Sequence, residues 1–348
     1  MKKLIHFVLV CVLSSTAAVF AQQEGETPYF SKNFKVSEID RLKVKTSGGA
    51  ISVKGGATDE ARVEMYVRSN NWNGKSNLSK EEIEERLEEY NITVRRAGTE
   101  LQAIAERKNK GWNDWKRSLS ISFKVYVPEK ITTDISTSGG SITLVQLKGK
   151  QDFQTSGGSL NLQDIGGQVR GRTSGGSIKL NGGSDNLDLQ TSGGSITAEN
   201  VRGSLQLSTS GGSINLKNLS GNTKATTSGG SIKADGIEGE LRTSTSGGSI
   251  RLTAINASLE ASTSGGGIEA EMIGLGSYLK LASSAGSIRV KMPMDKGMDL
   301  DLDGDRVQVG ELSKFDGTLE KDRVKGSVNG GGITVRMDAS AGGVYINR

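Results

Sequence analysis

An 18-residue repeat constrains what this chain can fold into more than any other feature of its sequence. The tetrapeptide Thr-Ser-Gly-Gly starts eight times at a constant spacing of 18 residues, at Thr137, Thr155, Thr173, Thr191, Thr209, Thr227, Thr245 and Thr263. With this threonine as position 1, position 6 is always Ile or Leu and position 8 is Leu or Ala, whereas positions 7, 9, 16 and 18 are mainly polar or charged. Such alternation on both sides of a Gly-Gly corner predicts two short strands per repeat, with their apolar faces inward. A second corner is expected near position 13, where glycine recurs.

A single repeat is too small to fold alone. Its three or four aliphatic side chains contribute roughly 1.5–3 kcal/mol each on burial, whereas ordering each of its residues costs about 1.5 kcal/mol. Stacked repeats share ladder hydrogen bonds and a continuous core, so we expect an all-β fold, a parallel β-solenoid of 18-residue coils. A flexible Gly/Ser linker would not keep Ile or Leu at position 6 of every copy.

The corner residues have expected roles in this solenoid. Strand alternation turns the threonine of position 1 inward and leaves the serine beside it facing out. We attribute the paired glycines to positive φ angles and to the close approach of successive coils.

Two segments without the repeat flank the regular coils. Residues 22–136 hold a first coil with a small α+β insertion, residues 137–290 the regular solenoid, and residues 291–348 a C-terminal β cap. A helix is expected over Ser79–Tyr90, because Ser79 and Glu82 form a capping box. Both flanks are expected to cover the unpaired strand edges at the ends of the stack. Strands are expected near Val63–Val67, Ile92–Arg96, Leu101–Arg107, Leu119–Val127, Met298–Leu302, Gly332–Met337 and Val344–Ile346.

Residues 1–21 have the pattern of a signal peptide, and its removal would limit the chemistry of the mature chain. Two lysines and a short apolar run precede Ala21, and the run is too short to span a bilayer. Cleavage there would remove Cys11 and His6, the only cysteine and the only histidine. We therefore expect no disulfide, thiolate nucleophile, histidine base or usual zinc site. Charges of both signs are interspersed along the chain, which does not favour nucleic-acid binding.

Three tryptophans are the candidate ligand-binding residues. Trp72, Trp112 and Trp115 lie in polar, loop-like stretches of the insertion, beside Asn, Lys and Asp. Exposed indoles in such loops suit stacking on a sugar ring or anchoring of a protein partner. The alternative, favoured by the high average burial of tryptophan, is that they pack the insertion onto the first coil.

A run of alternating aspartates imitates the start of a calcium loop. Asp299, Asp301, Asp303 and Asp305 have the spacing of its first ligands, but the carboxylate expected at loop position 12 falls on Gly310. A strand whose aspartates face water explains the alternation more simply. No metal site is therefore predicted.

Outward-facing acids raise the alternative of an enzyme. Parallel β-helices host polysaccharide lyases and hydrolases, and paired carboxylates work without histidine. Glu199, Asp235 and Glu269 are the available acids, but the coils have few long loops that could wall a cleft. We therefore expect no enzymatic activity, no catalytic residues and no cofactor.

Several segments resemble the bacterial "putative adhesin" family, a group of β-strand-repeat domains of unknown function. The resemblance lies in Leu42–Val44 leading to Ser47–Val53, in Val125–Pro128 before the repeats, in the Thr-Ser-Gly-Gly-Ser-Ile coils, and in the closing Gly326–Ile333. It covers essentially the whole chain after residue 21. It implies a β-strand-repeat fold and adhesion, and it provides no catalytic residues.

These observations favour an exported, non-enzymatic, adhesin-like scaffold at the periplasm or cell surface. Its rigid, repetitive surface would bind a glycan, a cell-envelope component or a protein partner. The alternatives are a carbohydrate-active β-helix enzyme and a purely structural envelope spacer. No transmembrane segment and no nucleic-acid partner are expected.

Overall fold

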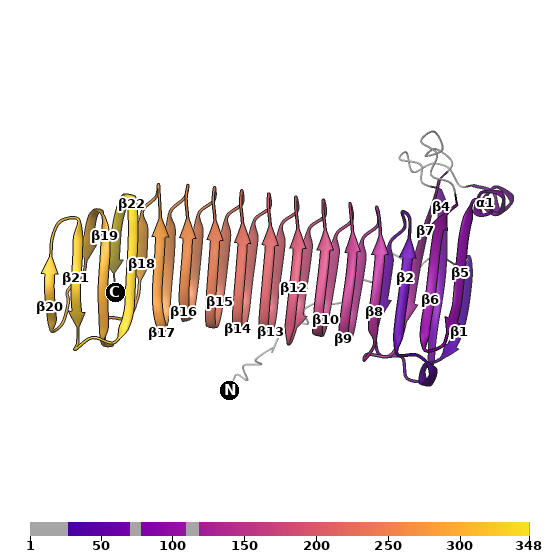
Figure 1. The fold of residues 1–348 in the computed structure, drawn as a ribbon, viewed down its shortest axis with the longest axis horizontal. Helices are drawn as coiled ribbons and strands as arrows, with labels where there is room; N and C mark the ends of the chain where they lie inside the picture. Colours follow the sequence, from indigo (N-terminus) through magenta and orange to yellow (C-terminus); the bar gives the residue numbers. More distant parts are fainter. Residues whose placement is uncertain (1–26, 70–77, 109–117, 348) are drawn as a thin grey trace, which may run out of the picture.

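The repeats stack along the long axis of an elongated molecule (Figure 1). The computed structural model describes residues 27–69, 78–108 and 118–347. From β9 to β16, neighbouring coils pair in parallel with a constant offset of one repeat, as in Leu160 with Ile178 and Thr173 with Thr191. The offset rises by two residues within the pairing of β16 with β17. The predicted parallel β-solenoid is confirmed. Its regular strands are β8 (Thr132–Thr137), β9 (Ile142–Thr155), β10 (Leu160–Thr173), β11 (Ile178–Gly183), β12 (Asn186–Thr191), β13 (Ile196–Thr209), β14 (Ile214–Thr227), β15 (Ile232–Thr245) and β16 (Ile250–Thr263).

Pairing in most coils continues through the second corner, so the two strands predicted per repeat form one 14-residue strand. The turn is made by left-handed residues at positions 10 and 13 rather than by position 13 alone. In β9 they are Gln146, with φ 55°, and Gly149, with φ 114°. Position 10 elsewhere is often Asn or Asp, as in Asn200, and these residues tolerate this conformation better than most. Among the regular coils from β9 to β16, all of which lie in the described part of the chain, only the one that holds β11 and β12 is divided into two strands.

The Gly-Gly corner differs from expectation in its backbone. Neither glycine of the repeated Thr-Ser-Gly-Gly has a positive φ, so this part of the prediction is wrong. Close approach is confirmed for the second glycine in every coil, since a Cβ on Gly158, for example, would overlap the carbonyl of Gly140 in the preceding coil. The first glycine is less crowded, and a Cβ there comes as near as 3.2 Å to a carbonyl only at Gly265. A Cβ on Gly157 would meet nothing nearer than 3.8 Å.

The threonine of position 1 is buried, as predicted, and bonds successive coils together. Thr155 Oγ1 donates to the Gly140 carbonyl at 2.9 Å and accepts from the Gly158 amide at 3.2 Å. The same pair of bonds recurs along the stack, for example around Thr209. Each of these hydroxyls therefore forms one hydrogen bond with a glycine amide of its own coil and one with a glycine carbonyl of the preceding coil.

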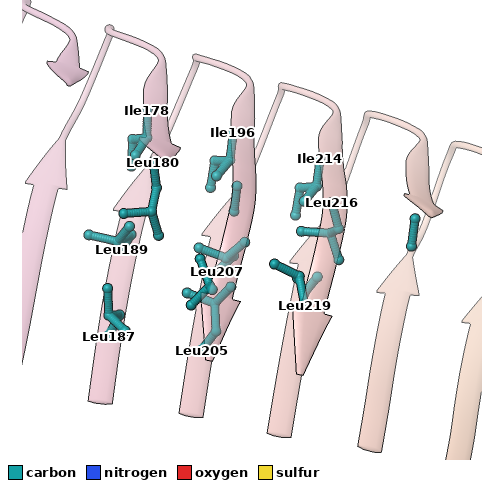
Figure 2. Close-up of a cluster of buried hydrophobic side chains, with 14 of the residues drawn as sticks. Ile178, Leu180, Leu187, Leu189, Ile196, Leu205, Leu207, Ile214, Leu216 and Leu219 are labelled. Atoms are coloured by element: carbon teal, nitrogen blue, oxygen red, sulfur yellow. The ribbon is translucent and has the colours of Figure 1, made fainter. Parts of the chain in front are cut away.

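Aliphatic columns fill the space between the two faces of the coil. Figure 2 shows Ile178, Leu180, Leu187 and Leu189 of one coil stacked on the equivalent residues of the next, and all four are buried. Where a column is irregular, a large side chain in one coil fills the space left by a small residue in the next. Phe153 is 1% exposed because the neighbouring coil has glycine at the same position, where a Cβ would meet the Phe153 ring.

At the N-terminal end, the insertion forms a layer outside the first coil. The strands β2 and β3 of that coil lie between β8 and β9 on one side and β6 and β7 on the other, with all of these pairs parallel. Antiparallel strands β5, β4 and β1 then extend this layer outward. The bounds are β1 Phe30–Lys35, β2 Arg41–Thr46, β3 Ile51–Lys54, β4 Glu60–Ser69, β5 Tyr90–Ala97, β6 Glu100–Arg107 and β7 Leu119–Tyr126.

The predicted helix is present as α1, Lys80–Leu87, at this same end (Figure 1), but it is shorter than expected, because Tyr90 already belongs to β5. Its capping box is formed as expected, with the Glu82 amide donating to Ser79 Oγ at 3.2 Å. Leu78 and Leu87 pack against the core. No helix among the described residues is long and apolar enough to cross a membrane.

At the C-terminal end, the last strand of the chain is not the outermost strand. β22 lies in parallel between the coil of β17 and β18 on one side and β19 on the other. Antiparallel β21 and β20 follow β19 and close this end (Figure 1). The bounds are β17 Ile268–Ser283, β18 Ile288–Lys291, β19 Met298–Val309, β20 Phe315–Leu319, β21 Arg323–Val328 and β22 Ile333–Asn347.

Candidate binding groove

A polar groove runs along the stack beside the Thr-Ser-Gly-Gly corner. It has a volume of about 610 Å³ and crosses successive coils from the coil of Lys45 to the coil of Ser208. Five steps of about 4.8 Å between neighbouring strands give it a length of roughly 24 Å. Its lining residues come from positions 18, 1 and 2 of these coils: Lys45, Thr46, Ser136, Thr137, Ser138, Gln154, Thr155, Ser156, Arg172, Thr173, Ser174, Gln190, Thr191, Ser192, Ser208 and Ser210.

Alternation along each strand decides which side chains of the groove are buried and which are exposed. In the coil of Thr173, the threonine side chain is buried, whereas Arg172 and Ser174 on either side of it are exposed. Thr173 Oγ1 is held by the Gly158 carbonyl at 2.7 Å and by the Gly176 amide at 3.3 Å. The floor of the groove is therefore bonded into the core, while amide, hydroxyl and guanidinium groups are presented above it.

The charges in the groove are few. Lys45 Nζ lies 2.6 Å from Glu106 Oε1, and this hydrogen bond and the carboxylate's charge raise the pKa of Lys45 above its ordinary value. Lys45 is therefore already paired. Arg172 forms no salt bridge within the described part of the chain, and no carboxylate belongs to the lining residues. The groove thus combines hydroxyl and amide groups with one unpaired positive charge.

A second hollow, of about 430 Å³, adjoins the groove on the same face. It is lined by residues of positions 14 to 16, among them Lys150, Arg170 and Asp188. Arg170 Nε lies 3.8 Å from Asp188 Oδ2, so these two charges largely offset each other. Asp188 also accepts a hydrogen bond from the Gln190 side chain at 2.9 Å.

The binding and catalytic residues considered in the sequence analysis do not lie in this groove where the structure describes them. Trp72, Trp112 and Trp115 lie outside the described residues, so their role in ligand binding stays a prediction. The acids proposed for an enzyme do not converge. Glu199 and Asp235 lie two coils apart in one column, with Lys217 paired between them in the ladder, whereas Glu269 Oε2 is bound to Arg251 at 2.8 Å.

The aspartate run lies on β19, as the strand interpretation predicted. Asp301 and Asp303 each lie 3.8 Å from a guanidinium nitrogen of Arg323. Asp299 accepts the Gly332 amide at 3.1 Å. Among the described residues, no group of three or more acidic, histidine or cysteine side chains is placed to hold a metal ion.

The sequence reasoning identified the outward serines but not the groove. The signal was available in the columns, since Gln154, Arg172 and Gln190 occupy position 18 of three successive coils. Whether such a column lies on a convex or a hollow surface depends on how the coils curve against one another.

The molecule is thus a parallel β-solenoid with a polar groove along its stack of coils. Comparison with known proteins agrees with this class. The chain belongs to the Toastrack DUF4097 family, whose family model matches residues 35–347. No curated protein matches the sequence significantly.

Three solved structures are similar over most of their lengths. A "putative cell adhesion protein" from Clostridium sporogenes has 11% identity, covers 92% of this chain and 99% of its own, and has a TM-score of 0.17. A "putative adhesin" from Parabacteroides merdae has 13% identity, covers 92% and 96%, and has a TM-score of 0.34. A "putative adhesin" from Bacteroides fragilis has 12% identity, covers 91% and 96%, and has a TM-score of 0.30. At these values the three structures do not bear on the details of this site or on its ligand.

Proposed function

We propose that this chain is an exported, adhesin-like scaffold that binds an extended glycan of the cell envelope or its surroundings. The observation that carries the proposal is the groove, which presents hydrogen-bonding side chains in register across successive coils. A ligand with a repeating covalent structure suits such a surface, because equivalent groups of the ligand meet equivalent groups of the protein.

The rigidity of the groove supports binding. Under it, the hydroxyls of Thr155, Thr173 and Thr191 each bond to a glycine of the preceding coil and to a glycine of their own coil, so the outward side chains start from a fixed backbone. A preorganised surface loses less conformational entropy when a ligand binds. Many weak contacts along one polymer then add to a useful affinity.

The arrangement of acidic residues supports a role without catalysis. Glycoside hydrolysis requires two carboxyl groups facing the same bond. Glu269 is bound to Arg251, and Glu199 and Asp235 are separated by a further coil. The groove lining contains no carboxylate that could supply the pair.

Export is part of the proposal and is supported by the signal-peptide pattern of residues 1–21. The absence of cysteine from the remaining chain is compatible with a stack held together by ladders rather than disulfides. N-terminal sequencing of the protein recovered from the producing cell tests it, and Gln22 is the first residue expected.

A glycan array with residues 22–348 tests the binding function. Ser174→Phe places a bulky side chain on an exposed position of the groove, and Asn215→Phe makes a comparable change on an exposed position of the opposite face. We expect the wild type and Asn215→Phe to bind the same linear glycans and Ser174→Phe to lose them. Absence of binding by the wild type would favour the structural spacer, and turnover of a bound glycan would favour the enzyme.

A further inference from the structure

One unpaired positive charge lies near the middle of the groove. Arg172 is exposed, and its neighbours at the same position of the adjoining coils are Gln154 and Gln190. The other cation of the lining, Lys45, is paired with Glu106. Within the described residues Arg172 has no such carboxylate, although the next arginine along its strand, Arg170, has one in Asp188.

We infer that the ligand of the groove is a linear acidic glycan and that Arg172 binds one of its carboxylates. This inference rests on the function proposed above. A guanidinium offers two parallel N–H donors that match the two oxygens of a carboxylate, and it stays protonated at any physiological pH. The other charged residue of the lining, Lys45, is paired with Glu106, so the unpaired guanidinium selects for an anionic group at that point of the ligand.

The neutral residues beside Arg172 suit the remaining groups of a sugar. Ser156, Ser174 and Ser192 each offer a hydroxyl that both donates and accepts, and Gln154 offers an amide with both functions. Sugar hydroxyls have the same dual character. The row of serines on one side of the threonines, and Gln154 beside Arg172 on the other, would contact both edges of a chain lying along the groove.

The same features argue against a nucleic acid in this groove. Nucleic-acid affinity comes mainly from neutralising several phosphates with Lys and Arg, and single strands also stack on aromatic rings. The groove lining holds one unpaired cation and no aromatic residue. A polymer with many hydroxyls for each charge matches this composition better.

Pectins that differ only in methyl esterification provide the test. Polygalacturonate and its highly esterified form share one backbone, but the ester has lost the negative charge. We expect residues 22–348 to bind polygalacturonate about tenfold more tightly than the ester at low ionic strength, with the difference decreasing as salt is added. Arg172→Gln, which copies the residues at this position of the neighbouring coils, should bring the two affinities together.

Arg202→Gln is the matched control, because it removes an exposed arginine of the second corner, outside the groove. It should leave the preference for polygalacturonate unchanged. Equal binding of acid and ester by the wild type would overturn the acidic ligand while leaving glycan binding intact. Equal effects of the two substitutions would overturn the assignment to Arg172. Failure of both polymers to bind would overturn the proposed function as well, and tighter binding of single-stranded DNA than of polygalacturonate would replace the glycan with a nucleic acid.

Discussion

Gly211 and Gly212 are the two glycines of one Thr-Ser-Gly-Gly corner. Replacing the one or the other by alanine should have opposite effects on the stability of the junction with the preceding coil. A Cβ on Gly212 would overlap the carbonyl of Gly194 in the preceding coil, and this neighbour is backbone rather than the end of a flexible side chain. A Cβ on Gly211 would lie 3.5 Å from the Gly193 carbonyl, which is ordinary contact. Neither glycine has a positive φ, so alanine is not excluded by backbone conformation at either position.

The expected free-energy changes come from the groups around Gly212. Overpacking a close contact costs about 1–3 kcal/mol. The same carbonyl of Gly194 accepts from Thr209 Oγ1 at 2.8 Å, and this hydroxyl accepts from the Gly212 amide at 3.2 Å. Weakening both bonds adds about 1 kcal/mol each. Gly212→Ala should therefore destabilise the junction by about 3–5 kcal/mol, whereas Gly211→Ala should stabilise it by about 0.4–1 kcal/mol through the unfolded state.

Hydrogen exchange measured by mass spectrometry is the suitable assay, because stability in a solenoid is a nearest-neighbour property and global unfolding is not two-state. In Gly212→Ala, the protection factors of amides in β13 and β14 should fall by a factor of about a hundred to a few thousand. Peptides of β17 and β18 serve as the remote reference. Equal loss of protection in the two variants would refute the steric argument, because only a Cβ on Gly212 would overlap a carbonyl of the preceding coil.

Three other predictions concern the core, the C-terminal end and the tryptophans. Phe153→Ala should cost about 3–5 kcal/mol at the junction of β9 and β10. Adding Gly171→Leu should recover part of this loss, because a side chain there points at the space of the Phe153 ring. Hydrogen exchange of β9 and β10 in the single and double variants measures the effect, and no recovery would show that the glycine does not make room for the ring. Deleting residues 333–348 removes the strand between β17 and β19 and leaves β19 with β21 as its one partner. The amides of β19 should therefore lose much of their protection from hydrogen exchange, while those of β13 remain protected. Trp112→Ala with Trp115→Ala should weaken glycan binding at an unchanged melting temperature, whereas a lower melting temperature alone would show that the indoles only pack the insertion.

The elements whose signals are local were predictable. The capping box of Ser79 and Glu82 identified α1 because both partners lie within one helical turn. The burial of Thr173 between exposed Arg172 and Ser174 followed from the period of two that every strand obeys. The strand over the aspartate run of β19 was predicted for the same reason.

The corner glycines show where this reasoning stops. Positive φ was expected there because glycine is the residue that most readily adopts it. The structure has instead an ordinary backbone at the corner and a carbonyl of another coil above the second glycine. The left-handed residues lie at the second corner, and several of them, such as Asn200, are not glycine.

The repeat in the sequence determined the period of the coil, the side chains that face the core and the parallel stacking, because all three follow from alternation along one strand and from the need to bury its apolar face. Only the tertiary structure decided that β6 and β7 lie outside the first coil, that β22 lies inside β19, and that the column through Arg172 borders a groove. The order of strands at the two ends depends on which edges pair, and these edges are far apart in the chain. The shape of a surface depends on the curvature of many coils together, and no single repeat encodes it.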